Sequence, residues 1–338
     1  IQQPFFSFVV FASVLGVLYA IFTTPLDYYR GFVHLHNYGL SNQSFSRWTI
    51  NYVGGVVGLA FFGLPLISLF YGLLKWSPRF WWFYISLSLV PVYLILVLLV
   101  PVAFDPLFND FGPMKDKHLE AKIVGLAERA GLERGQVFEV NKSADTNAVN
   151  AYVTGFAGTR RIVLWDTIIE KLDEDELLFV MGHEIGHFVL GHIQQGLVVL
   201  IFGTFLFTFL LKFVSERLLA GFPKLFQVSR LSEPGAIPVM LLVGTILAIL
   251  LNPVGMAVSR HFETEADRFA LEITRSNEAG ATAFVKMQSE NLSNPRPPAL
   301  IKWMRSSHPS ISERVDFCNR YRPWEREQPG VYEHLFKP

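Results

Sequence analysis

The sequence predicts a mainly α-helical, polytopic membrane protein whose water-facing part contains a small antiparallel β-sheet. Three observations lead to this fold class: long apolar stretches without charge, an apolar overall composition, and a polar middle section with β-rich runs. Of the 338 residues, 51% are hydrophobic and 17% are charged, and the mean hydropathy is +0.33. Soluble domains contain about 25% charged residues, so much of this chain is expected to contact lipid.

About five stretches are long enough and apolar enough to cross a bilayer, which takes about 20 residues. They run roughly from Pro4 to Pro25, Val53 to Leu74, Phe80 to Phe104, Ile193 to Leu211 and Ile237 to Val258. The alternative is a large soluble protein with buried helices, but five such runs would leave too little chain to cover them. The lipid bilayer is therefore expected to be a partner of this protein.

Charge and cysteine content exclude several classes of protein. Lysine plus arginine and aspartate plus glutamate both number 29, so no net field favours nucleic acid. The single cysteine, Cys318, excludes an internal disulfide and a zinc site built from cysteines. We expect Cys318 to be a packed helix residue.

The polar section from residue 105 to 173 is expected to face water and to hold one helix and three short strands. An amphipathic helix is predicted from Asp116 to Ala130, with Gly131 as its stop, and a strand from Gln136 to Val140. Two further β-rich runs, Val149 to Thr154 and Arg161 to Trp165, flank a turn at residues 155–160 and predict an antiparallel hairpin.

A helix with a metal-binding pattern follows this section. Asp173 and Glu176 resemble a helix N-cap and its capping-box partner. The helix that they begin is expected to continue into the fourth apolar stretch. It carries His183-Glu184-Ile185-Gly186-His187, and at about 100° per residue the two histidines lie one turn apart on one face. Both imidazoles can bind one zinc ion, and Glu184 can take a proton from a zinc-bound water.

Two imidazoles and a water leave one zinc ligand to be found. In the related zinc-binding pattern H-E-x-x-H-x-x-G-x-x-H, the third histidine would fall on Ile193. His192 is one residue short, and on a continuous helix it lies about 140° from His187. We therefore expect His192 to cap or pack rather than to bind metal.

A glutamate on another helix is the better candidate for the missing ligand. Glu263 and Asp267 are four residues apart on one helical face, so one can bind zinc while the other holds a ligating imidazole by its second nitrogen. Glu265 lies about 200° from Glu263 and is expected to point away. Because membrane spans alternate in direction, the section before the fourth span and the section after the fifth lie on one side of the membrane. The loop from Leu26 to Asn51 lies on that side too, but lysine and arginine counts leave the orientation open.

These motifs together resemble the type I CAAX prenyl protease family, whose members are integral-membrane zinc metalloproteases. The resemblance is carried by the His183 to His187 motif, the block from Ser259 to Asp267, and Ser307-His308-Pro309 followed by Glu313-Arg314, in this order and interleaved with membrane spans. Further similar segments are Tyr38–Ser41, Asp105–Asn109, Asn150–Phe156 and Arg161–Thr167.

The resemblance implies a zincin-like protease domain with one Zn²⁺ per chain. His183, His187 and Glu263 would bind zinc, Glu184 would be the catalytic base, and Asp267 would hold a zinc-bound imidazole. His308 would stabilise the oxyanion, and Arg314 would brace that region or bind the end of the substrate. Asn150, Ala151 and Tyr152 would lie on the strand along which a peptide substrate adds.

The implied organisation is four segments: three membrane helices in 1–104, half of the protease domain in 105–192, two membrane helices in 193–258, and the other half of the protease domain in 259–338. Eukaryotic members of the family have seven spans, so either two lie upstream of Ile1 or the enclosure is more open here. The bacterial plasma membrane or the endoplasmic reticulum membrane is the expected location.

The expected activity is hydrolysis of peptide bonds by zinc-activated water, in the C-terminal processing of prenylated proteins or peptides. One alternative is a heat-shock-type zinc protease that removes misfolded membrane proteins. Another alternative is a non-enzymatic membrane scaffold with structural zinc, which Glu184 argues against because a closed structural site needs no base.

Overall fold

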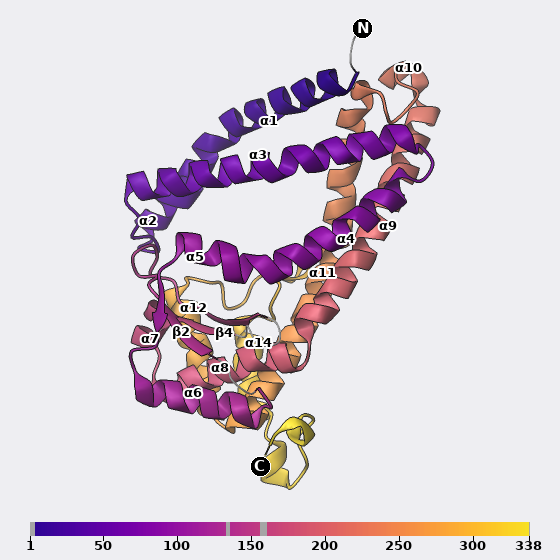
Figure 1. Cartoon of the computed structure of the whole chain (residues 1–338). Coiled ribbons are helices and arrows are strands. Elements are labelled where there is room, and N and C mark those ends of the chain that lie inside the picture. The colour runs from indigo at the N-terminus through magenta and orange to yellow at the C-terminus, as the bar shows by residue number, and fades with distance from the viewer. Residues whose placement is uncertain (1–3, 133–135, 156–160, 338) are drawn as a thin grey trace. The chain divides into compact units, whose positions relative to one another are not determined.

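The computed structural model describes the chain except for residues 1–3, 133–135, 156–160 and 338 (Figure 1). Its residues group into two compact units. The first unit contains residues 1–94 and 198–251, and the second contains residues 95–197 and 252–338. Within the described residues, five helical segments are long and apolar enough to cross a membrane, as predicted. The chain is a multi-pass integral membrane protein.

The first unit is built from long helices. They are α1 (Pro4–Tyr28), which continues through a π-helical turn (Tyr29–His34) into α2 (Leu35–Asn37), then α3 (Phe45–Trp76), α4 (Trp81–Leu99), α9 (His192–Gly221) and α11 (Ile237–Thr274). The short α10 (Pro223–Phe226) and a 3₁₀ turn (Pro234–Ala236) lie between α9 and α11. Both α9 and α11 have one end in each unit.

Packing between these helices combines an apolar cluster with hydroxyl contacts. Trp81 is completely buried, and it belongs to a cluster with Tyr71 and Met240. The Ser86 hydroxyl lies 2.7 Å from the Thr208 hydroxyl, which links α4 to α9. Such hydrogen bonds between helices satisfy polar groups that lipid cannot. Many large apolar side chains elsewhere on these helices are exposed, as a surface that contacts lipid requires.

The second unit contains a four-stranded sheet. The strands are β1 (Phe111–Pro113), β2 (Gln136–Val140), β3 (Ala151–Thr154) and β4 (Arg161–Trp165), and their order in the sheet is β1-β2-β4-β3. Strands β3 and β4 pair antiparallel, so the predicted hairpin is confirmed, although its turn residues 156–160 lie outside the described part. A π-helical segment (Val100–Phe104) and α5 (Asp105–Phe108) precede the sheet.

The sheet is mixed, and the expectation of a purely antiparallel sheet is wrong. Strand β2 pairs parallel with β4. After β2 ends at Val140, the chain skips the neighbouring strand position and forms β3 at the edge of the sheet. Strand β4 then fills the position between β2 and β3. Within the described residues, β3 therefore pairs with a strand along one edge only.

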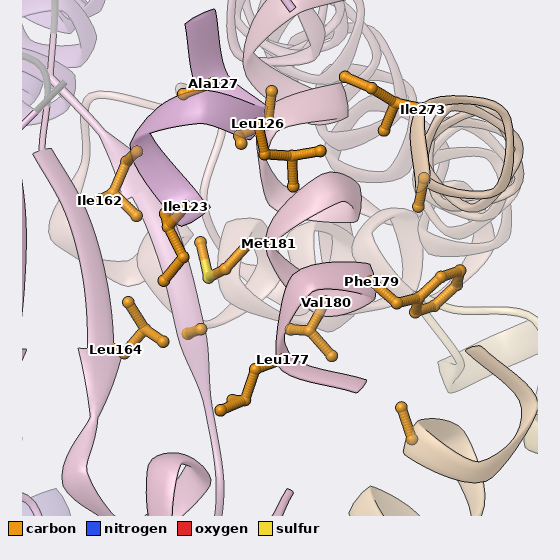
Figure 2. Packing of buried hydrophobic residues seen from close by; sticks show 14 of the residues in the cluster. Ile123, Leu126, Ala127, Ile162, Leu164, Leu177, Phe179, Val180, Met181 and Ile273 are labelled. Atoms are coloured by element: carbon orange, nitrogen blue, oxygen red, sulfur yellow. The ribbon is translucent and has the colours of Figure 1, made fainter. Parts of the chain in front are cut away.

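Helix α6 (Lys117–Arg129) covers the sheet as the predicted amphipathic helix. The Asp116 carboxylate caps it by accepting hydrogen bonds from the backbone N–H groups of His118 and Leu119. Gly131, with φ +80°, follows its end, which is the left-handed conformation that glycine adopts readily. Ile123 and Leu126 face the core (Figure 2).

Helix α8 (Glu174–Val189) crosses the centre of this core, after the short α7 (Asp166–Lys171). The predicted capping box is present: the Asp173 carboxylate accepts from the backbone N–H of Glu176, and the Glu176 carboxylate accepts from that of Asp173. Figure 2 shows side chains of α8 between β4 and Ile273 of α11. The packed α8 residues are Leu177, Phe179, Val180 and Met181.

Two glycines of α8 allow it to approach α11 closely. A Cβ at Gly182 would lie 3.3 Å from the Cα of Ala270, and a Cβ at Gly186 would lie 3.1 Å from the ring of Phe269. Phe269 is completely buried. The glycines that flank the histidines of α8 therefore bring those histidines close to α11.

Helix α8 does not continue into the fourth membrane helix, so that expectation is wrong. It ends at Val189, and α9 begins at His192. The physical reason is Gly191, whose φ of +71° is left-handed and breaks the helical path. The angle predicted between His187 and His192 assumed a continuous helix and does not apply.

The C-terminal part of the second unit packs against α8 and α11. It contains α12 (Asn277–Glu290), α13 (Ala299–Arg305), α14 (Ile311–Arg320) and two 3₁₀ turns (Pro323–Arg326 and Glu333–Leu335). Cys318 is completely buried on α14, as expected. The Glu272 carboxylate accepts hydrogen bonds from the backbone N–H groups of Val331 and Tyr332 at 2.9 and 2.7 Å, which ties the C-terminal segment to α11.

Candidate active site

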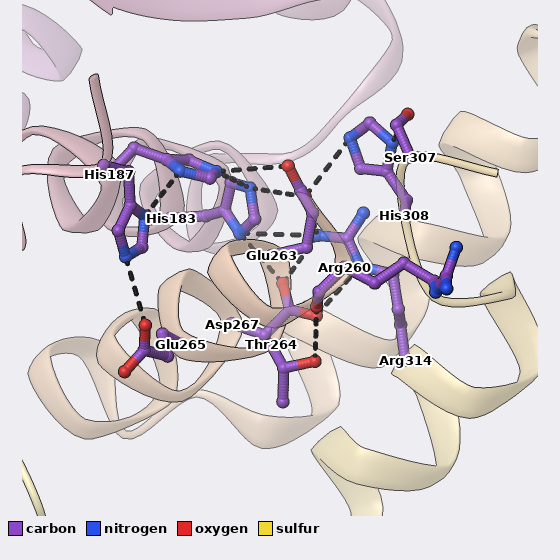
Figure 3. Close-up of polar contacts among 11 residues, drawn as sticks. His183, His187, Arg260, Glu263, Thr264, Glu265, Asp267, Ser307, His308 and Arg314 are labelled. Carbon is purple, nitrogen blue, oxygen red and sulfur yellow. Dashed lines mark hydrogen bonds and ion pairs between the residues drawn. The ribbon is translucent and has the colours of Figure 1, made fainter. Parts of the chain in front are cut away.

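The centre of the second unit brings together two histidines of α8 and a glutamate of α11. The Nε2 atoms of His183 and His187 lie 3.1 Å apart (Figure 3). The Glu263 carboxylate faces both: Oε2 is 3.3 Å from His183 Nε2, and Oε1 is 3.4 Å from His187 Nε2. These three residues form a group whose potential ligand atoms all lie within 4.8 Å of one another.

The group fits a tetrahedral metal ion. Zinc–nitrogen bonds of about 2.0–2.1 Å place neighbouring tetrahedral ligand atoms about 3.3 Å apart. The two nitrogens are 3.1 Å apart, and each lies 3.3 or 3.4 Å from a different oxygen of the Glu263 carboxylate, so the separations are close to that value. Glu263 Oε2 is buried and forms no hydrogen bond in the described part of the chain, although the Nε2 atoms of His183 and His308 lie 3.3 and 3.2 Å from it. A buried carboxylate oxygen without a hydrogen bond is costly, and a bound cation removes that cost. Two nitrogens and one carboxylate also leave a fourth position open, as catalytic zinc sites do.

The far side of His183 is held by Asp267. His183 Nδ1 lies 2.8 Å from Asp267 Oδ1, so the ring donates a proton there and turns Nε2 toward Glu263. Arg314 donates from Nε to Asp267 Oδ2 at 2.9 Å. All three side chains are buried. This arrangement fixes both the position and the tautomer of the His183 ring.

The far side of His187 is held differently. Its Nδ1 lies 2.9 Å from Nδ1 of His192. The opposite nitrogen of His192, Nε2, faces Glu265 Oε2 at 3.4 Å. Glu265 stands outside the group of ligand atoms, as predicted. The contact between His187 and His192 is not predicted by their spacing; Gly191 is the feature of the sequence that indicates it, because glycine commonly ends a helix.

Glu184 lies on α8 beside the two histidines. Burial raises the pKa of its carboxyl group, while the positive charges of His183, His187 and Arg314 act in the opposite direction. Within the described residues, no hydrogen bond or ion pair engages the Glu184 carboxylate. It is therefore available to a water or a substrate, and a raised pKa suits a general base that works near neutral pH.

His308 reaches the same centre from the loop between α13 and α14. Its Nε2 lies 3.2 Å from Glu263 Oε2, and its Nδ1 lies 2.8 Å from the Ser307 hydroxyl. Burial lowers the pKa of His308, with Glu263 acting against that shift. A neutral ring that accepts from Ser307 carries its proton on Nε2, on the side of the metal-binding group.

Arg314 lies behind the metal-binding group. Its guanidinium is buried, contacts Asp267 and lies 3.7 Å from Glu263 Oε2. It also packs over the ring of Phe284, with 3.9 Å from Cζ to the ring centroid. Of the two roles expected for Arg314, this position favours bracing over contact with the end of a substrate.

Strand β3 packs against α8, and no described strand pairs with its outer edge. Asn150, which precedes the strand, is exposed, whereas Ala151 is buried and the Tyr152 hydroxyl donates to Asp105 at 3.2 Å. A hollow of about 570 Å³ has Asn150, His308 and Arg314 among its lining residues. Of the three residues predicted to lie along the substrate, Asn150 lines this hollow together with His308, the predicted oxyanion donor, whereas Ala151 and Tyr152 are not among its lining residues.

Comparison with protein-family models gives two matches. Residues 113–321 match the model of peptidase family M48. Residues 1–110 match the model described as the CAAX prenyl protease N-terminal domain with five membrane helices.

Relatives are found in bacteria and eukaryotes. An uncharacterized metalloprotease of Bacillus subtilis, YhfN, is 38% identical over 94% of this chain and 74% of the relative. A CAAX prenyl protease 1 homolog of Dictyostelium discoideum is 31% identical over 92% of this chain and 71% of the relative. The crystal structure of S. mikatae Ste24p superposes with a TM-score of 0.83 and 26% identity, covering 95% of this chain and 77% of that one.

Proposed function

We propose that this membrane metalloprotease, which belongs to peptidase family M48, uses zinc and cleaves peptide bonds near the C-termini of prenylated proteins or peptides. The observation that carries the proposal is the convergence of His183, His187 and Glu263, with Glu184 on the same helix as the histidines and without a hydrogen bond or ion pair among the described residues. Two imidazoles and one carboxylate with an open fourth position are the ligand set of hydrolytic zinc sites.

Each residue has a role that its position supports. His183, His187 and Glu263 would hold the zinc, which when bound supplies Lewis acidity and lowers the pKa of water toward about 7. Glu184 would take the proton of the attacking water and pass it to the leaving amine. His308 would donate from Nε2 to the oxygen of the tetrahedral intermediate.

Binding and bracing fall to the residues around this centre. A peptide would add to the open edge of β3 beside Asn150, Ala151 and Tyr152, because backbone groups at a strand edge can pair with a peptide of any sequence. Asp267 would orient His183, and Arg314 would hold Asp267 in place.

The test of the chemistry is Glu184→Gln. The substitution keeps the shape of the side chain but removes the base, so peptide cleavage should be lost while one zinc per chain is retained. Zinc content by atomic spectroscopy and cleavage of a peptide by mass spectrometry measure the two outcomes. Retained cleavage with zinc bound would end the assignment of Glu184 as the base.

The test of the substrate class compares three substrates with the full chain in lipid. They are a farnesylated peptide with a C-terminal CAAX sequence, the same peptide without the farnesyl group, and an unfolded membrane protein. Burial of apolar groups contributes about 0.8 kcal/mol per CH₂, so the farnesylated peptide should be preferred by well over tenfold. Equal cleavage of the two peptides, with faster cleavage of the unfolded protein, would instead favour a quality-control protease.

A further inference from the structure

The two histidines of the metal-binding group differ in what supports them. His183 donates to a carboxylate, Asp267, at 2.8 Å. His187 has a second imidazole in that position, with His192 Nδ1 at 2.9 Å from its own Nδ1. Nothing in the spacing of His183 and His187 requires this asymmetry. It results from the helix break at Gly191, which places His192 beside His187.

The positions of the protons follow from this contact. His187 turns Nε2 toward Glu263 and His183, so the nitrogen that would bind metal is Nε2, and the ring proton sits on Nδ1. That proton can only be donated if Nδ1 of His192 accepts it. The proton of a neutral His192 must then sit on Nε2, which faces Glu265 Oε2 at 3.4 Å.

The surroundings of His192 hold it in this state. Its side chain is only 4% exposed, and its ring stacks on Phe262 with centroids 4.5 Å apart. Its Nε2 is buried and forms no hydrogen bond in the part of the chain that the structure describes, which leaves the carboxylate of Glu265 as the charge that it faces. Glu265 is itself fixed, because the Tyr332 hydroxyl donates to its Oε1 at 3.0 Å (Figure 3 shows His187 and Glu265).

We propose that His192 is a positioning residue for the metal ligand His187, and that Glu265 keeps His192 in the tautomer that accepts the His187 proton. This inference rests on the proposed function only in that His187 binds a metal. Removal of a group that holds a ligating histidine by its second nitrogen typically weakens metal binding by about 10–100-fold.

The test measures zinc affinity of the full chain in detergent by competition with a fluorescent chelator. His192→Phe keeps the ring and its stacking on Phe262 but removes the acceptor, and zinc should bind about 10–100-fold more weakly. His192→Asn restores an acceptor, since its Oδ1 replaces Nδ1, and should recover most of the loss. His261→Phe is the matched control, because His261 contacts Glu265 at 3.3 Å and is 68% exposed, and no hydrogen bond, ion pair or ring contact among the described residues joins it to His187.

Two further measurements distinguish a positioning role of His192 from a general loss of protein stability. The metal-free His192→Phe protein should unfold at the same temperature as the metal-free parent. The visible spectrum of Co²⁺ bound in place of zinc should change in His192→Phe and return toward that of the parent in His192→Asn. Should His192→Phe fail to fold, Glu265→Leu against the exposed His261→Phe makes the same comparison, and Glu265→Leu should bind zinc more weakly.

The outcomes distinguish this inference from the function on which it rests. Zinc affinity of His192→Phe equal to that of the parent would overturn the role of His192 and leave the protease assignment intact. An equal loss in His192→Phe and His261→Phe, or no recovery in His192→Asn, would overturn it as well. A parent chain that binds no zinc would refute the proposed zinc site itself.

Discussion

Gly186→Ala tests how the fold builds the metal site. The added Cβ would lie 3.1 Å from three atoms of Phe269, where ordinary contacts begin near 3.4 Å. Phe269 is completely buried and packs against the rings of Tyr332 and Phe336, so its side chain cannot move away from the added Cβ. Helix α8 or α11 must therefore shift by a few tenths of an ångström. Metal–ligand distances tolerate only about 0.2 Å, so the shift should separate Glu263 from His183 and His187.

The energetic balance of Gly186→Ala can be worked from two opposing effects. Overpacking of a core costs about 1–3 kcal/mol, and replacing glycine by alanine inside a helix returns about 1 kcal/mol. The net change in the free energy of unfolding should be a loss of up to about 2 kcal/mol. Zinc affinity should fall by at least about tenfold, as it does when a supporting group is lost.

The assay compares zinc affinity and thermal unfolding of Gly186→Ala with those of Gly125→Ala. Gly125 lies inside α6, and a Cβ there meets nothing within 4 Å. Gly125→Ala should stabilise the protein by about 0.5–1 kcal/mol and leave zinc affinity unchanged. If Gly186→Ala behaves like Gly125→Ala in both measurements, the close approach of α8 and α11 does not position the site.

Three further predictions concern single side chains. Asp267→Asn should weaken zinc binding by about 10–100-fold in chelator competition, because His183 loses its carboxylate partner; unchanged affinity would exclude that role. His308→Ala should lower kcat by about a hundredfold or more with zinc retained, as expected for loss of an oxyanion donor, and a change in KM alone would contradict it. Asp173→Ala should cost about 0.5–2 kcal/mol of stability at neutral pH through loss of the helix cap. Burial acts to raise the pKa of Asp173, but hydrogen bonds from Glu176 and Lys286 outweigh it and hold the pKa below its usual value. The ionised carboxylate therefore stabilises the folded protein fully at pH values above the usual pKa of an aspartate. This stabilisation is lost as the pH falls through the lower pKa of the folded state. Thermal unfolding of both proteins against pH measures this, and a difference that grows in acid would refute it.

The local parts of the fold could be predicted because single segments determine them. The five membrane helices follow from length and lack of charge, and the caps at Asp116 and Asp173 follow from side-chain chemistry at fixed offsets. The convergence of His183, His187 and Glu263 could be predicted as well. The spacing places the histidines on one face, and the family resemblance supplies the glutamate from a distant helix.

What the sequence did not reveal depends on contacts between segments. The parallel pairing of β2 with β4 depends on a crossover past a strand position, which the alternation of apolar residues does not encode. The contact between His187 and His192 depends on the left-handed backbone at Gly191, because one changed φ redirects every residue after it. The buried position of Arg314 depends on how α14 packs against α12.

The central claim is that His183, His187 and Glu263 together hold one zinc ion. Anomalous diffraction at the zinc edge, from crystals of the full chain loaded with zinc, tests it most directly. The claim predicts one peak per chain, with the Nε2 atoms of both histidines and one oxygen of Glu263 about 2.0–2.2 Å away. A peak elsewhere, or a zinc ion bound without the Glu263 carboxylate, would contradict it.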